Sequence, residues 1–160
     1  MASARLTHHG YNMLRTELQD LIEVQRPQVV ADLAQAREYG DLSENAEYDI
    51  AKRDHSLIEG RIKELEHLLA SVEIIEMPGQ VEEACLGAEV RVMNLDVKQE
   101  RRYTLVTEQE AHLVSDYLSV DSPLGRALLG GKVGDLVTFE APAGTRRFQV
   151  LALRGYTGAA

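Results

Sequence analysis

The chain has 160 residues, 44% hydrophobic and 27% charged, which is typical of a folded protein with one ordinary domain or two small ones. Its formal net charge of −9 argues against a protein that grips free duplex DNA, because such proteins are usually basic. The first ten residues lack the apolar segment of a signal peptide, and no apolar run approaches the roughly 20 residues that span a bilayer, so we expect a cytoplasmic protein. The single cysteine, Cys85, has no partner for an internal disulfide.

Residues 8–38 carry apolar residues at helical spacing, and Thr7 is a candidate N-cap for this helix. Pro27 lies inside the pattern. Because proline removes a backbone donor, we expect it to bend the helix. The apolar positions are Leu14, Leu18, Leu21, Ile22, Val29, Leu33 and Ala36.

Residues 38–49, EYGDLSENAEYD, contain five carboxylates and no Lys or Arg. Asp41 and Glu44 have the spacing of a capping box, and Ser43 is an alternative cap. Acidic side chains at the start of a helix also stabilise it by roughly 0.3–1 kcal/mol each. A third explanation is that the charged turn is simply solvated. The functional alternative is a site for Mg²⁺, or for Mn²⁺, which the same oxygens suit. Two exposed carboxylates form an incomplete site, so another protein would supply the remaining ligands.

A second helical pattern follows in residues 50–75, with apolar residues at steps of 4, 3, 4 and 3. These are Ile58, Ile62, Leu65, Leu69 and Val72. Two helices with facing seams predict an antiparallel coiled-coil hairpin over residues 1–76, with the acidic turn at its far end. At ~1.5 Å per residue, arms of about 30 residues would be roughly 45 Å long.

Three basic residues, Arg37, Lys52 and Arg53, flank the acidic turn and would approach each other in such a hairpin. One explanation is ordinary ion pairing with neighbouring acids, for example between Asp49 and Arg53. The alternative is a basic patch that holds a phosphate backbone.

After a linker at residues 77–81, the pattern becomes strand-like over residues 82–160. Strands are expected at 88–95, 101–107, 112–120, 135–142 and 145–153, with a hairpin turn at 142–144. Between them, Ser122 is suited to cap a short helix, Pro123 to begin it and Gly130 to end it. The expected fold class is therefore α+β, with a helical hairpin followed by a small antiparallel sheet and one short helix.

Three stretches, RPQVVADLAQAREYGDLSENAEYDIAK, EGRI at 59–62 and VDSPLGRALLGGKVGD at 120–135, closely resemble the bacterial transcript cleavage factors of the Gre family. The resemblance covers essentially the whole chain. It implies a coiled-coil hairpin that enters the secondary channel of a backtracked RNA polymerase, followed by an FKBP-like globular domain. The factor would stimulate the polymerase to cut its own transcript. Because the exposed carboxylates lack a pocket and a full ligand set, we expect that the chain is not an enzyme by itself, and we expect a monomer in isolation.

The same resemblance implies roles for individual residues. Asp41 and Glu44 match the acidic tip residues that help to hold a second Mg²⁺ and the attacking water. The positions of Arg37, Lys52 and Arg53 match the basic patch toward the nascent RNA 3′ end. At the other end of the chain, Asp121, Ser122 and Pro123 match the loop by which the globular domain grips the polymerase.

Two rival functions remain open at this point. The first is a non-catalytic inhibitor that uses the same hairpin and docking domain to block the polymerase channel. The second is an independent FKBP-like prolyl isomerase, which the scarcity of aromatic residues, two Phe and no Trp, disfavours.

Overall fold

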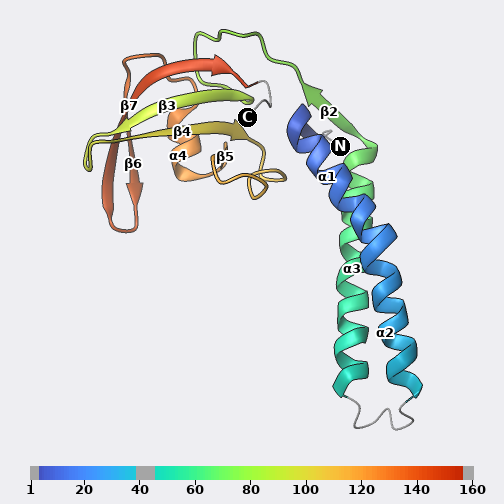
Figure 1. The fold of residues 1–160 in the computed structure, drawn as a ribbon. Coiled ribbons are helices and arrows are strands. Elements are labelled where there is room, and N and C mark those ends of the chain that lie inside the picture. The colour runs from blue at the N-terminus through green and yellow to red at the C-terminus, as the bar shows by residue number, and fades with distance from the viewer. Residues whose placement is uncertain (1–3, 39–45, 157–160) are drawn as a thin grey trace. The chain divides into compact units, whose positions relative to one another are not determined.

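The computed structural model describes residues 4–38 and 46–156 (Figure 1). The chain divides into two compact units. One consists of Met1–Tyr11 together with Glu73–Ala160, and the other is Asn12–Val72. The two units are described in turn.

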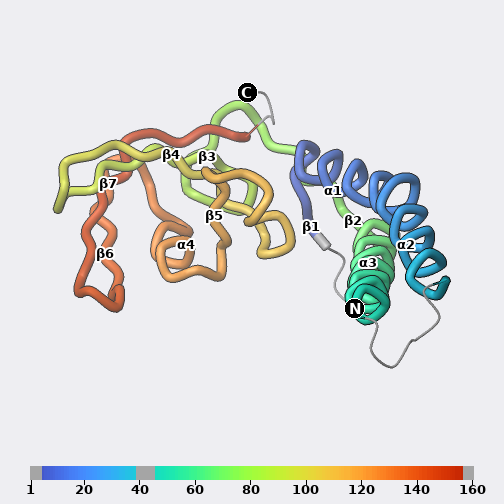
Figure 2. The backbone as a smooth tube through the Cα atoms, turned by 60° about the horizontal axis from the view of Figure 1, so that its bottom comes forward, coloured from blue at the N-terminus to red at the C-terminus, as the bar shows by residue number. Residues whose placement is uncertain are grey.

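The described residues of the unit Asn12–Val72 are helical as far as Ala70. Helix α1 (His8–Asp20) enters it from the other unit and continues through a π-helix, η1 (Leu21–Gln25), into α2 (Arg26–Glu38). Helix α3 (Ala46–Ala70) lies beside α2 in both Figure 1 and Figure 2. The buried side chains along these helices are Leu14, Leu21, Val29, Ala36, Ala51, Ile62 and Leu65. The predicted helices and their apolar contact are therefore confirmed.

Just ahead of Pro27, where we expected a bend, the helix widens into the π-helix η1. There the Arg26 backbone N–H donates to the Leu21 carbonyl, five residues back rather than four. A proline ring cannot fit against the carbonyl four residues before it, and a π-turn relieves that clash by widening the helix. The extra residue also shifts the apolar seam. Ile22, expected in the seam, is 37% exposed, so that prediction is wrong.

A two-stranded sheet that the sequence did not suggest joins β1 (Ala4–Thr7) to β2 (Val72–Ile75). Val72 was expected as the last position of the helical seam, but it belongs to β2, because α3 ends at Ala70. The β-branched run VEII favours a strand once a partner strand is available.

The globular part of the other unit is a five-stranded sheet in the order β5-β4-β3-β7-β6. Its strands are β3 (Ala88–Asn94), β4 (Gln99–Val106), β5 (Tyr117–Ser119), β6 (Leu136–Ala141) and β7 (Gly144–Gly155). All neighbours are antiparallel except β4 and β5, which are parallel. The sheet is thus antiparallel-rich, as the α+β prediction required, but its edge strand β5 is a correction to a wholly antiparallel arrangement.

The strand expected at 112–120 is mostly absent, since only Tyr117–Ser119 is extended. The preceding residues form successive tight turns, in which the Glu110 N–H donates to Thr107 and the Leu113 N–H donates to Glu110. These turns satisfy the backbone locally, so the segment needs no strand partner.

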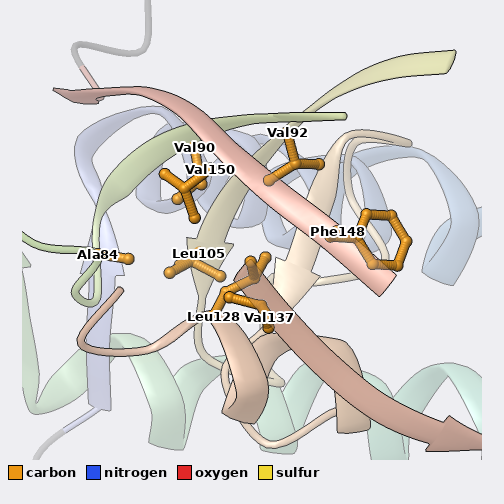
Figure 3. Close-up of a cluster of buried hydrophobic side chains, with 8 residues drawn as sticks. All are labelled: Ala84, Val90, Val92, Leu105, Leu128, Val137, Phe148 and Val150. Atoms are coloured by element: carbon orange, nitrogen blue, oxygen red, sulfur yellow. The ribbon is translucent and has the colours of Figure 1, made fainter. Parts of the chain in front are cut away.

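The core of this unit lies between the sheet and the short helix α4 (Pro123–Leu128). Alternate residues of β3, Val90 and Val92, point into it beside Leu105 of β4 and Leu128 of α4 (Figure 3). Each fully buried aliphatic side chain contributes roughly 1.5–3 kcal/mol of transfer free energy. The core residues are Ala84, Val90, Val92, Leu105, Leu128, Val137, Phe148 and Val150.

The predicted hairpin turn at 142–144 is confirmed, since β6 ends at Ala141 and β7 begins at Gly144, which has φ +127°. Within the described residues, no helix combines the length and apolar character that a membrane crossing requires.

Candidate functional site

The helical pair consists of α3 and of the continuous segment α1–η1–α2. Two ion pairs fix the register of these two partners. Arg26 of α2 donates to both carboxylate oxygens of Glu59 on α3, at 2.7 and 3.1 Å. Arg61 of α3 makes the same bidentate contact with Glu17 of α1, at 2.6 and 3.0 Å. The hydrogen bond that Arg61 donates to Glu17 is the main reason why the pKa of Arg61 is raised. Bidentate geometry tolerates little sliding of one helix along the other.

The same register holds at the end of the pair where α2 stops and α3 begins. There the Arg37 guanidinium lies over the ring of Tyr48, 5.9 Å from its centroid. Along α2, Arg37 follows Arg26 by eleven residues, and along α3, Tyr48 precedes Glu59 by eleven residues. The two pairs therefore share one register. Tyr48 of α3 therefore contacts a residue at the end of α2, and a cation–π contact of this kind is worth roughly 0.5–1 kcal/mol.

The three predicted RNA-contacting residues, Arg37, Lys52 and Arg53, are all exposed. Arg37 and Lys52 both neighbour Tyr48, because Lys52 follows it by one helical turn. No described contact joins Arg53 to either of them. Across the described part of the chain, none of the three takes part in an ion pair, and the suggested pairing of Asp49 with Arg53 is absent.

The predicted metal ligands, Asp41 and Glu44, lie outside the described residues, as does the alternative cap Ser43. By chain position they belong to the segment 39–45, which connects the last residue of α2 to the first residue of α3. Among the residues that are described, no three or more His, Cys, Asp and Glu side chains are arranged to hold a metal ion.

An acidic groove beside these helix ends was not anticipated. It has a volume of about 250 Å³ and is lined by Asp32 of α2, by Glu47 and Asp54 of α3, and by the exposed side chain of Ile50. Glu47 and Asp54 are one heptad apart, which places them on one face of α3. That spacing was the available signal, but the facing position of Asp32 depends on the register of the helices.

The second predicted site is the loop before α4. Ser122 caps α4, because its Oγ accepts from the Gly125 N–H at 3.1 Å and donates to the Ser119 carbonyl at 2.6 Å. The Asp121 N–H in turn donates to the Ser119 hydroxyl at 3.1 Å, and Pro123 occupies the first turn of the helix. The predicted helix start is confirmed. These hydrogen bonds fix the backbone of the loop from which the exposed side chains of Asp121 and Pro123 extend.

Gly125 completes this loop. It is buried, and a Cβ at this position would overlap the Ser119 carbonyl oxygen, which is the acceptor for Ser122. No side chain larger than hydrogen fits here without moving the backbone. The loop is therefore a preformed surface rather than an adaptable one.

Comparison with known families gives two matches that together span the chain. Residues 4–74 match a family described as "Transcription elongation factor, N-terminal". Residues 79–154 match a family described as "Transcription elongation factor, GreA/GreB, C-term".

Individual relatives agree with these matches. The chain is 44% identical to the transcription elongation factor GreA of Thermotoga petrophila over 153 residues, which cover 96% of this chain and 98% of the relative. It is 46% identical to the GreA of Syntrophotalea carbinolica over 151 residues, with 93% and 95% covered. Among solved structures, the GreA factor homolog 1 protein of Thermus thermophilus is 30% identical, with 96% of this chain and 100% of that chain covered and a TM-score of 0.44.

Proposed function

The chain belongs to the GreA/GreB family of transcription elongation factors, and on this basis we propose that it binds RNA polymerase and stimulates cleavage of the RNA 3′ end in backtracked complexes. The observation that carries the proposal is the extent of the family match, which includes the helical pair, the connecting segment and the docking loop. In this proposal the protein acts in the cytoplasm as a cofactor of the polymerase active site, not as an enzyme by itself.

The helical pair delivers acidic side chains to the polymerase. Asp41 and Glu44 belong by sequence to the segment that connects α2 to α3, so we expect the polymerase to receive these two carboxylates together with the helix ends. Their oxygen atoms suit a magnesium ion, and the ion would supply the positive charge that activates water and stabilises the leaving oxygen. Because two carboxylates leave most positions around such an ion unfilled, the polymerase and the RNA phosphates complete the site.

The exposed basic residues near the same end orient the RNA. Arg37 and Lys52 flank Tyr48, and their charges are not neutralised by an ion pair within the described chain. Cations in this state attract a phosphate backbone. The cation–π contact with Tyr48 limits the freedom of the Arg37 side chain, so less entropy is lost when a phosphate binds.

The globular unit supplies affinity through the loop Asp121–Pro123. The hydrogen bonds of Ser122 and Ser119 preform this surface, which lowers the entropic cost of docking. Cleavage and binding therefore depend on different residues, and this separation makes the proposal testable.

The test compares Asp41→Ala and Glu44→Ala with the matched control Asp49→Ala, an exposed acid in the first turn of α3. Each tip variant is expected to lower the cleavage rate in stalled complexes by about tenfold or more, as loss of a metal-site residue typically does. Binding, measured by competition for the polymerase, should be unchanged, and Asp49→Ala should retain most of the cleavage.

Equal loss of binding and cleavage in the tip variants would contradict the assigned roles. Nucleotide addition by an unstalled complex separates the rival function, because an inhibitor of the polymerase slows addition and a cleavage factor does not. Catalysis of peptide isomerisation by the factor alone would favour the prolyl isomerase.

A further inference from the structure

A buried carboxylate lies outside both sites described above. Glu110, in the turns between β4 and β5, is 0% exposed. Its two oxygens accept hydrogen bonds from the backbone N–H of Thr7 at 2.8 Å and from the Thr7 hydroxyl at 2.6 Å. The two residues are 103 positions apart in the sequence and belong to the same unit.

Together, Thr7 and Glu110 form a helix cap whose two halves come from different parts of the chain. Thr7 directly precedes α1, and its Oγ1 accepts from the Gly10 N–H at 3.0 Å, as an N-cap does. In an ordinary capping box, the third helical residue is Glu or Gln, and its side chain accepts from the N-cap N–H. Here that residue is Gly10, and Glu110 accepts this hydrogen bond instead.

Gly10 leaves the room that Glu110 occupies. A Cβ on Gly10 would lie 2.6 Å from the Glu110 carboxyl carbon and 2.8 Å from its Oε2. The glycine and the distant glutamate are therefore complementary. Within the described chain, Glu110 forms no ion pair with Lys, Arg or His, and the hydrogen bonds to its carboxyl group come from Thr7.

A second contact joins the same two segments. The Thr107 hydroxyl donates to the Arg5 carbonyl of β1 at 3.1 Å. The Tyr117 phenol is hydrogen-bonded to Tyr156 at 3.1 Å, and burial is the main reason why its pKa is raised. The start of α1 is thus held by several groups of the segment 107–117.

We propose that Glu110 is a positioning residue that ties the first turn of α1 to the globular unit. The proposal rests on the proposed function. Because α1 begins in one unit and continues into the other, this turn is where the helix that carries the acidic segment is anchored. The tie keeps the helix anchored while the loop Asp121–Pro123 is docked on the polymerase.

The test separates a tie from a mere helix cap by moving the carboxylate. Glu110→Ala removes both functions. The double variant Gly10→Glu/Glu110→Ala places a glutamate at the third helical position, where it forms an ordinary capping box with Thr7, but leaves α1 without a link to the segment 107–117. Glu108→Ala, an exposed acid two residues from Glu110, is the matched control.

Two measurements are made on each full-length protein: hydrogen exchange of residues 4–12, and cleavage at saturating factor with polymerase binding measured separately. Glu110→Ala should raise exchange in residues 4–12 by roughly tenfold, because two buried donors lose their acceptor. The double variant should return exchange at the start of α1 to within about twofold of the parent protein, while cleavage stays at least about threefold lower with unchanged binding.

Recovery of full cleavage by the double variant would overturn the proposal, because a local cap would then suffice. Unchanged exchange in Glu110→Ala would overturn it as well. Should Glu110→Ala fail to fold, Thr7→Val removes the hydroxyl at similar shape and must raise exchange in the same peptide. If the parent protein stimulates no cleavage at all, the proposed function fails, and the exchange data alone decide whether the tie exists.

Discussion

Substitution of Gly125 by alanine is expected to destabilise the docking loop more than its small size suggests. The added methyl group would overlap the Ser119 carbonyl oxygen, a backbone atom that cannot rotate away. The first turn of α4 must then move, and the Ser122 cap, with its 3.1 Å bond to the Gly125 N–H, is lost with it.

The magnitude follows from two contributions. Loss of a serine N-cap costs about 1 kcal/mol. Overpacking of a buried position costs typically about 1–3 kcal/mol. We therefore expect Gly125→Ala to lower the free energy of unfolding by roughly 2–4 kcal/mol and to weaken binding to RNA polymerase.

Chemical denaturation followed by circular dichroism measures the first effect, and competition for the polymerase measures the second. Gly60→Ala is the matched control, since Gly60 lies inside α3 with nothing within 4 Å of an added Cβ. That substitution should stabilise the protein by about 0.5–1 kcal/mol. A Gly125→Ala protein within about 0.5 kcal/mol of the parent would refute the steric argument, because ordinary surface changes fall in that range.

Two further predictions concern the buried core of the helices and the buried acid. Ile62→Ala should cost about 2–5 kcal/mol in denaturation experiments, because Ile62 is fully buried, whereas Leu57→Ala, at a side chain 65% exposed, should be close to neutral. Burial raises the pKa of Glu110 above its ordinary 4.5, and the Thr7 hydrogen bonds oppose this only in part. The stability from Glu110 is therefore fully present below pH 4.5 and is lost as pH rises through the raised pKa. In a denaturation series from about pH 4 to 8, Glu110→Gln should remove the fall in the free energy of unfolding that accompanies ionisation of Glu110. If Glu108→Gln removed the same fall, the pH dependence would belong to Glu108 and the prediction would be wrong.

Local signals in the sequence predicted the local structure well. The cap of Ser122 with Pro123 after it, the turn at 142–144 and the helical period before residue 70 each depend on residues a few positions apart. Their physics is short-ranged, so a single sequence contains it.

What the sequence did not predict depends on partners that are distant in the chain. Strand β2 pairs with β1, which lies at the other end of the helical segment in the sequence. Glu110 is buried against Thr7 and Gly10, which precede it by 103 and 100 positions. The sequence near Thr7 gives one local sign of its contact with Glu110. Thr7 is a residue type that begins a capping box, but the third helical position, where Glu or Gln is expected, is Gly10. A missing acid at that position can indicate a distant acceptor.

The side chains between α2 and α3 bear on how the helix ends could enter another protein. In the second half of α3 the buried residues are the large aliphatic Ile62 and Leu65, whereas near the segment 39–45 the buried positions are the alanines Ala36 of α2 and Ala51 of α3. The distance between packed helices ranges over roughly 8–10 Å and is set by the side chains at the contact. Alanine on both helices permits a closer approach than larger side chains would, and this is the end of the helices that the proposed function sends into the polymerase. Alanine also buries less apolar surface than leucine, so apolar packing stabilises this end of the helices less. The Arg26–Glu59 ion pair and the Arg37–Tyr48 contact therefore provide a larger share of what fixes the register there.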